Sequence, residues 1–159
     1  TVLAATDHNT ITPATQVLVQ AMREAGLNVD AQSMDWGSVV SRRAKKEPPG
    51  AAGGWHMFHT WHAGADCVTP ASYVAIRGNG DKAWFGWPNI PTIETEVAAW
   101  FDAKTLDEEK AAIARLNKEA FANAVYAPTG FFQIYQAWRS NLDGVVKGPL
   151  PFFWDVKKA

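Results

Sequence analysis

The start of the chain alternates apolar and polar stretches in the order strand, helix, strand. The apolar run Val2–Thr6 predicts a short buried strand. A helix is expected to begin at Thr12-Pro13, with the threonine as N-cap and the proline in the first helical position, and to end at Gly26. Asn28–Met34 alternates polar and less polar residues and predicts a second strand. Such a unit of about thirty residues favours parallel pairing with a right-handed crossover. The predicted apolar face of the helix consists of Ala14, Val17, Leu18, Ala21, Met22 and Ala25.

Three more helices are predicted from caps and helical spacing. Asp35 is expected to cap the next one, which ends in a group of cations formed by Arg42, Arg43, Lys45 and Lys46. Four cations at a helix C-terminus are typical of a solvated face and too few for a nucleic-acid footprint. A third helix is indicated by Ile93, Val97, Trp100 and Phe101. Thr105 and Glu108 form a capping box for a fourth, whose expected apolar face is Ile113, Leu116, Ala120, Phe121 and Ala124.

Further strands and loops are expected between and after these helices. A Pro/Gly loop that includes Gly50 leads to Trp55–Trp61, which reads as a short, buried, central strand. Residues 70–91 show little periodicity, which is typical of a structured binding loop. Phe131–Arg139 is predicted to be a strand, and the tail from Asn141, punctuated by glycines and by Pro149 and Pro151, is expected to hold one short strand at most.

Composition narrows the class of protein. The chain has 159 residues, of which 47% are hydrophobic and 19% charged, as in a globular domain. Its formal net charge of −1 gives no basic surplus for nucleic acid. The only cysteine, Cys67, cannot form an internal disulfide. Because the chain starts at Thr1, without Met and directly before an apolar strand, we expect it to be a piece of a longer protein.

Candidate chemistry is concentrated between Trp55 and Pro70. This stretch holds three of the four histidines, the cysteine, an aspartate and two of the eight tryptophans, which either fill the core or stack on a ligand. His56, His59 and His62 recur every three residues, a spacing that suits a metal ion on a helix. On a strand, however, His59 would point away from the other two, and a metal site is therefore disfavoured.

Asp66 lies in the loop after the expected strand. Its carboxylate could pair with a ligand's ammonium group, or it could simply cap a turn before Pro70. Cys67 lacks an identifiable histidine and carboxylate constellation, so a bystander thiol is the preferred interpretation. The sequence contains no convincing catalytic set, and no cofactor is expected.

Five segments, taken in order, resemble one protein family. They are N-V-D-A-Q-S-M-D-W-G (Asn28–Gly37), R-R-A-K-K-E-P-P (Arg42–Pro49), G-W-H-M-F-H-T-W (Gly54–Trp61), R-G-N-G-D-K-A-W-F-G-W-P (Arg77–Pro88) and N-L-D-G-V-V-K-G-P-L-P-F-F-W-D-V (Asn141–Val156). The family is the dipeptide/oligopeptide-type substrate-binding proteins of bacterial ABC importers, solute-binding family 5. The chain resembles the C-terminal third of such a protein.

The resemblance implies an α/β fold, namely the second lobe of a periplasmic-binding-protein-like (type II) fold with a mixed sheet flanked by helices. Residues 1–140 would form the ligand-binding lobe, and residues 141–159 would return to the missing N-terminal lobe. In peptide-binding members an Asp in an A-D-x-x-x-P context pairs with the peptide's amino group, and Ala65–Pro70 matches that context. Asp66 is then the anchor, Trp61 packs against the ligand, and His59 or His62 lines the cleft.

The function implied is periplasmic capture, without catalysis, of a peptide or similar amine-bearing solute for permease subunits in the inner membrane. An alternative within the same fold is a metal- or chelate-binding member that uses His56, His59 or His62. A third hypothesis is a hydrolase that depends on a metal or on Cys67.

Overall fold

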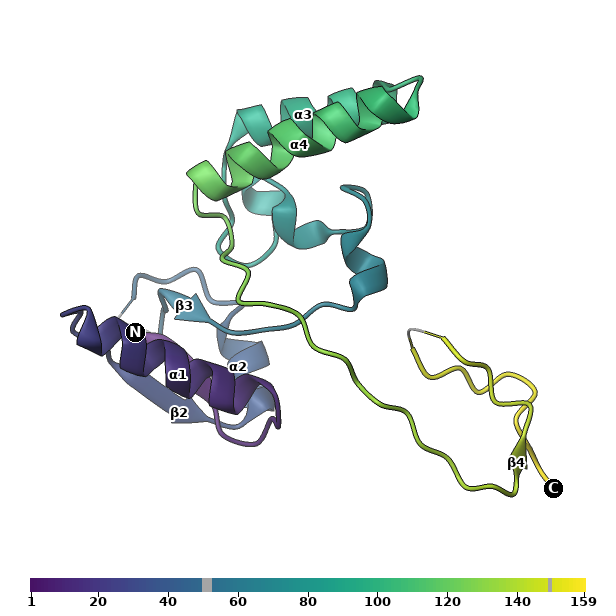
Figure 1. Ribbon diagram of the computed structural model, residues 1–159. Coiled ribbons are helices and arrows are strands. Elements are labelled where there is room, and N and C mark those ends of the chain that lie inside the picture. The colour runs from purple at the N-terminus through teal and green to yellow at the C-terminus, as the bar shows by residue number, and fades with distance from the viewer. Residues whose placement is uncertain (50–52, 149) are drawn as a thin grey trace. The chain divides into compact units, whose positions relative to one another are not determined.

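The computed structural model describes residues 1–49, 53–148 and 150–159, so that Gly50 and Pro149 of the predicted loops lie outside the described residues (Figure 1). The chain divides into two compact units, Thr1–Trp61 and His62–Ala159, and each is described by itself. None of the described helices is both long enough and apolar enough to cross a membrane.

The first unit is built on a three-stranded sheet of β1 (Val2–Ala5), β2 (Ala31–Met34) and β3 (Met57–Phe58), in the order β2-β1-β3. Both pairs are parallel, which confirms the parallel strand–helix–strand unit. The predicted mixed sheet is wrong for the described residues, because the antiparallel pair of this chain belongs to the second unit. The predicted central strand is also wrong: only two of its residues pair with β1, they lie at the edge, and both are half-buried.

Two helices cover this sheet, α1 (Ile11–Glu24) and α2 (Trp36–Arg42). Val2 packs with Val19 of α1, whereas Leu3 packs with Val39 of α2. Since successive strand residues point to opposite faces, the two helices lie on opposite faces of the sheet. Figure 1 shows α1 along one of them. Asp35 caps α2 as predicted, because its carboxylate accepts the backbone N–H of Ser38 at 2.9 Å.

Helix α1 ends where predicted but starts earlier. Gly26 adopts a φ of 86°, and the backbone N–H groups of Gly26 and Leu27 bond back to the last turn, as in a Schellman C-cap. Thr12 is not the N-cap: it lies inside the first turn, and its hydroxyl accepts the backbone N–H of His8 at 3.2 Å. The buried face also differs from the predicted one: Val17 is exposed, and the buried positions are Ile11, Thr15 and Val19.

The cations after α2 are only partly a solvated face. Lys45 and Lys46 are exposed, as expected. Arg42, in contrast, donates to the carbonyl oxygens of Gly53 and Gly54 at 2.8 and 3.3 Å. The Arg43 guanidinium lies 5.7 Å from the centroids of two aromatic rings, those of Trp36 and Phe58. The two arginines therefore hold the segment that leads into β3.

The second unit contains an antiparallel helix pair, α3 (Pro91–Asp102) and α4 (Leu106–Ala122), which run side by side (Figure 1). The predicted capping box is confirmed, since Thr105 and Glu108 bond to each other's backbone N–H. Ile93, Val97, Leu116 and Ala120 form the core between the helices, while the predicted core residues Phe101 and Phe121 are exposed. Ala124 lies beyond α4 with a φ of 49°.

The segment Arg77–Pro88 folds as a loop that is tied to the start of α3. Glu94 accepts from the Arg77 guanidinium at 3.0 Å and from the backbone N–H of Gly78 at 2.8 Å. These contacts lower the pKa of the Glu94 carboxyl, with the hydrogen bond from Arg77 as the largest cause. The loop closes through two backbone bonds, from Gly80 to Pro88 and from Ile90 to Gly78.

The tail differs from the prediction. In the described part of Phe131–Arg139 the backbone joins no strand ladder, and Phe131 and Tyr135 are 97% and 91% exposed. A strand requires a neighbouring strand to bond, and none of the described segments pairs with Phe131–Arg139. Residues 141–159 hold two short strands instead of one, β4 (Leu142–Asp143) and β5 (Lys157–Lys158), which pair antiparallel.

Candidate functional site

The strand order of the first unit creates a switch in direction beside β1. The chain passes from β1 to β2 on one side and then returns to place β3 on the other side of β1. In open parallel sheets, ligands bind outside the carboxyl ends of the strands at such a switch point. The segments that leave these ends are residues 6–10 after β1 and residues 59–61 after β3.

His59 lies at this edge and contacts a buried hydroxyl. Its Nδ1 is 3.1 Å from Oγ1 of Thr15, which is 1% exposed and also lies 2.9 Å from the carbonyl oxygen of Ile11. Because the hydroxyl has a single proton, donation to the carbonyl requires that Nδ1 carry the imidazole proton. Burial lowers the pKa of the His59 imidazole.

The lowered pKa of His59 predicts that this unit loses stability in acid. The unfolded chain takes up the proton near pH 6.5, before the folded chain does, so protonation favours unfolding. The contribution is present above pH 6.5 and is lost as the pH falls through the folded pKa. We expect the difference in melting temperature between the wild-type protein and His59→Gln to shrink between pH 7.5 and pH 5, with His56→Gln, at an exposed position, as the control. A difference in melting temperature between the wild-type protein and His59→Gln that stays constant from pH 7.5 to pH 5 would contradict a lowered pKa of His59.

Trp61 is the last residue of the first unit and is 41% exposed. Its indole N–H points at Nε2 of His8, 3.1 Å away. His8 follows β1, and its ring also meets that of Trp36 edge-on, with 5.4 Å between centroids. A tryptophan and a histidine from the two strand ends thus come together at the edge where a ligand is expected.

His62 and Asp66 belong to the second unit. The ring of His62 meets those of Tyr73 and Trp84 edge-on, with centroid separations of 5.3 and 5.2 Å. Burial, with contributions from Tyr126 and Cys67, raises the pKa of the Tyr73 phenol to about 12, so this hydroxyl stays neutral. Together with Tyr73 and Trp84, the half-buried His62 thus belongs to a cluster of aromatic rings.

Asp66 sits in a 3₁₀ turn, Gly64–Cys67, and is exposed. Its backbone N–H bonds to the carbonyl of Ala63 at 2.8 Å, but the turn has no side-chain cap. Among the described residues, none hydrogen-bonds to the Asp66 carboxylate. Burial, with a smaller contribution from the negative charge of the neighbouring Asp66, raises the pKa of the Cys67 thiol. A thiol held in its neutral form is a poor nucleophile.

The three clustered histidines have separate partners. His56 Nδ1 lies 2.8 Å from the backbone nitrogen of Thr1, His59 contacts Thr15, and His62 packs against aromatic rings. Within residues 1–49, 53–148 and 150–159, no three His, Cys, Asp or Glu side chains lie close enough together to hold a metal ion. The geometry therefore gives no support to the metal-binding alternative.

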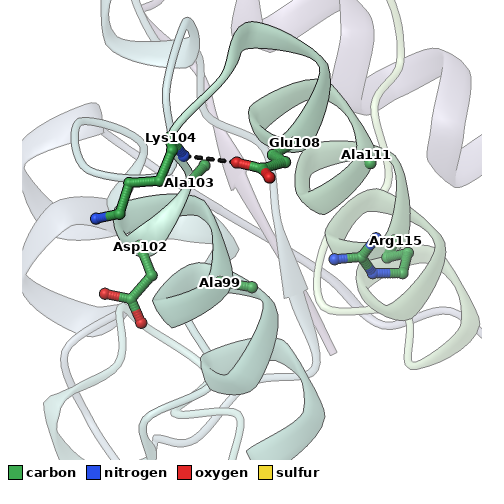
Figure 2. Close-up of a pocket in the computed structure, with 7 residues that line it drawn as sticks. All are labelled: Ala99, Asp102, Ala103, Lys104, Glu108, Ala111 and Arg115. Carbon is green, nitrogen blue, oxygen red and sulfur yellow. Dashed lines mark hydrogen bonds between the residues drawn. The ribbon is translucent and has the colours of Figure 1, made fainter.

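A hollow of about 400 Å³ lies between the end of α3 and the start of α4 (Figure 2). Two of its charged side chains are engaged within the helix pair: the Glu108 carboxylate accepts the backbone N–H of Lys104 at 2.6 Å, and Arg115 donates to Glu96 at 2.8 Å. The hollow contains none of the predicted site residues. Its full lining is Ala99, Asp102, Ala103, Lys104, Glu108, Ala111 and Arg115.

Sequence reasoning missed His8, Thr15, Tyr73 and Trp84 as partners of the predicted site residues. The signal for His8 was its position directly after an apolar strand, where ligand contacts gather in α/β folds. Its partner Trp61 lies 53 positions away, so no local pattern could join the two.

No family model matches the chain. It is, however, 34% identical over 158 residues, or 99% of its length, to a probable peptide ABC transporter periplasmic-binding protein of Sinorhizobium fredii. The chain spans 30% of the length of that relative. The predicted resemblance is confirmed: over nearly its whole length the chain is similar to a probable periplasmic-binding protein of a peptide ABC transporter.

Proposed function

We propose that the chain is the C-terminal part of a two-lobed binding protein that captures a peptide or a similar amine-bearing solute in the periplasm. The observation that carries this function is the 34% identity over 99% of the chain to a protein named as a probable peptide ABC transporter periplasmic-binding protein. The complete protein would close over its ligand and deliver it to permease subunits in the inner membrane, without catalysis.

Within this proposal Asp66 anchors the ligand's ammonium group. An exposed carboxylate with no hydrogen-bond partner among the described residues is available for a charge-assisted hydrogen bond. Trp61 packs against the ligand, and His59 and His62 line the cleft. The rings of both histidines already contact other side chains, His59 that of Thr15 and His62 that of Tyr73. These contacts suit a position in the wall of the cleft better than coordination of a metal ion.

The proposal is tested by titrating the complete protein with a mixed pool of di- to oligopeptides while its tryptophan fluorescence is recorded, with and without a chelator. A saturable change that survives the chelator is the expected result. A change that the chelator abolishes would instead favour the metal- or chelate-binding alternative. The absence of any change would overturn peptide capture.

A further inference from the structure

The cluster of aromatic rings around His62 extends beyond Tyr73 and Trp84. The ring of Tyr126, which follows α4, meets that of Tyr73 edge-on with 5.5 Å between centroids. Both tyrosines pack against the buried core between α3 and α4. The aromatic cluster, which we define as His62, Tyr73, Trp84 and Tyr126, is nevertheless only half-buried at each of its members. It therefore has one side against the core and another side that reaches the surface.

The hydroxyl groups of Tyr73 and Tyr126 belong to the side that reaches the surface. In the part of the chain that the structure describes, neither hydroxyl has a hydrogen-bond partner. A tyrosine hydroxyl enclosed in a protein core normally has one. Burial is the largest cause of the raised pKa of both phenols, and the charge of Cys67 contributes to each. The Cys67 thiol consequently lies near both hydroxyls.

Asp66 directly precedes Cys67, and two compact turns connect it to Tyr73. The first is the 3₁₀ turn that holds Asp66 and Cys67. In the second, the backbone N–H of Tyr73 donates to the carbonyl oxygen of Thr69 at 3.0 Å. The hydroxyls of Thr69 and Ser72, which lie 3.0 Å apart, hold the second turn closed. Asp66 therefore lies beside the aromatic cluster.

Two apolar side chains are exposed next to these turns. Val68, two residues after Asp66, is 69% exposed, and Val74, directly after Tyr73, is 51% exposed. Exposed apolar side chains that adjoin one another are typical of a ligand-binding groove. The surroundings of the Asp66 carboxylate thus combine aromatic rings with aliphatic side chains.

We infer that the aromatic cluster, together with Val68 and Val74, forms a pocket that selects a large apolar or aromatic side chain at the first position of the ligand. This inference rests on the proposed function and deepens it. In a peptide, the ammonium group and the first side chain are attached to the same carbon atom. An ammonium group paired with Asp66 therefore places the first side chain against the groups beside Asp66. Aromatic rings stabilise an apolar side chain that they cover, whereas the charge of Asp66 repels an acidic one.

The test compares peptide pools that differ only in their first residue, which is phenylalanine, leucine, glycine or aspartate. The complete protein should bind the phenylalanine and leucine pools at least about tenfold more tightly than the glycine pool, as expected for the burial of one large apolar side chain. The aspartate pool should bind most weakly. Equal affinities for the phenylalanine, leucine and glycine pools would overturn the pocket.

Two variants connect this preference to the proposed pocket. Tyr73→Ala removes one of its rings and should reduce the ratio of affinities for the phenylalanine and glycine pools to about threefold or less. Tyr73→Phe, which keeps the ring, should retain the wild-type ratio. Val68→Ser should also lower the ratio, and it changes an exposed side chain without disturbing the core behind Tyr73. A wild-type ratio in both Tyr73→Ala and Val68→Ser would overturn the inference.

The ratio is the appropriate readout because a loss of folded protein weakens the apparent binding of both pools equally. Phe101→Ala is the matched control, since it removes another aromatic ring of the same unit, at the opposite end of α3 from the core residue Ile93. Its ratio should equal that of the wild-type protein. Failure of the wild-type protein to bind any of the four pools would overturn the proposed function itself, whereas equal binding of the phenylalanine, leucine and glycine pools would overturn the pocket and leave peptide capture intact.

Discussion

Replacing Asp66 by asparagine in the complete protein is expected to weaken its binding of amine-bearing peptides by roughly 30- to 150-fold. A charge-assisted hydrogen bond contributes about 2–3 kcal/mol, which corresponds to that ratio of dissociation constants. The substitution keeps the shape of the side chain and removes only its charge. Because the turn that holds Asp66 makes no side-chain cap, the fold should be unaffected.

The matched control is Asp107→Asn, which neutralises another exposed carboxylate of the same unit, in the first turn of α4. Its affinity for the peptide pool should equal that of the wild-type protein. Isothermal titration gives both dissociation constants. Equal affinities for Asp66→Asn and the wild-type protein would remove Asp66 from the site.

Replacing Gly78 by alanine is expected to destabilise the second unit by about 1–3 kcal/mol, the usual range for overpacking. An added Cβ would lie 2.7 Å from the Ile90 carbonyl oxygen and 3.2 Å from the Cβ of Ile93. The backbone of Ile90 cannot move away easily, because its N–H donates a hydrogen bond to the Gly78 carbonyl oxygen at 2.8 Å. Glu94, which also accepts from the Gly78 N–H, would be displaced with it.

Gly64→Ala controls for the loss of glycine itself, since a Cβ at that position meets no atom within 4 Å. Thermal unfolding of the complete protein should give a clearly lower melting temperature for Gly78→Ala than for Gly64→Ala. Equal melting temperatures would show that the close approach of Gly78 to Ile90 does not limit stability.

Local signals in the sequence predicted much of the fold. The Asp35 cap, the Gly26 C-cap and the Thr105–Glu108 capping box each depend on residues within a few positions of one another, and all three are present. Strands were predicted less well, because pairing depends on distant residues. The predicted strand Phe131–Arg139 joins no ladder, and of Trp55–Trp61 only Met57 and Phe58 pair with β1.

The candidate site was predictable in its residue types and not in its partners. The loop position of Asp66 could be read directly from its flanking glycine and proline. The role of His8 could not be read from its neighbours in sequence. Its ring accepts hydrogen bonds from the backbone N–H groups of Thr10 and Ile11 at the start of α1, and it also lies beside the side chain of Trp61, 53 positions further along the chain. The same histidine explains why α1 starts before the expected Thr12.

Capture of a solute through its amino group can be tested by comparing the binding of two peptide pools to the complete protein. One pool has free amino termini, and the other is the same pool after N-acetylation. We expect saturable binding of the free pool and at least tenfold weaker binding of the acetylated pool, because acetylation removes the charge that Asp66 would pair with. Equal binding of the two pools would contradict it.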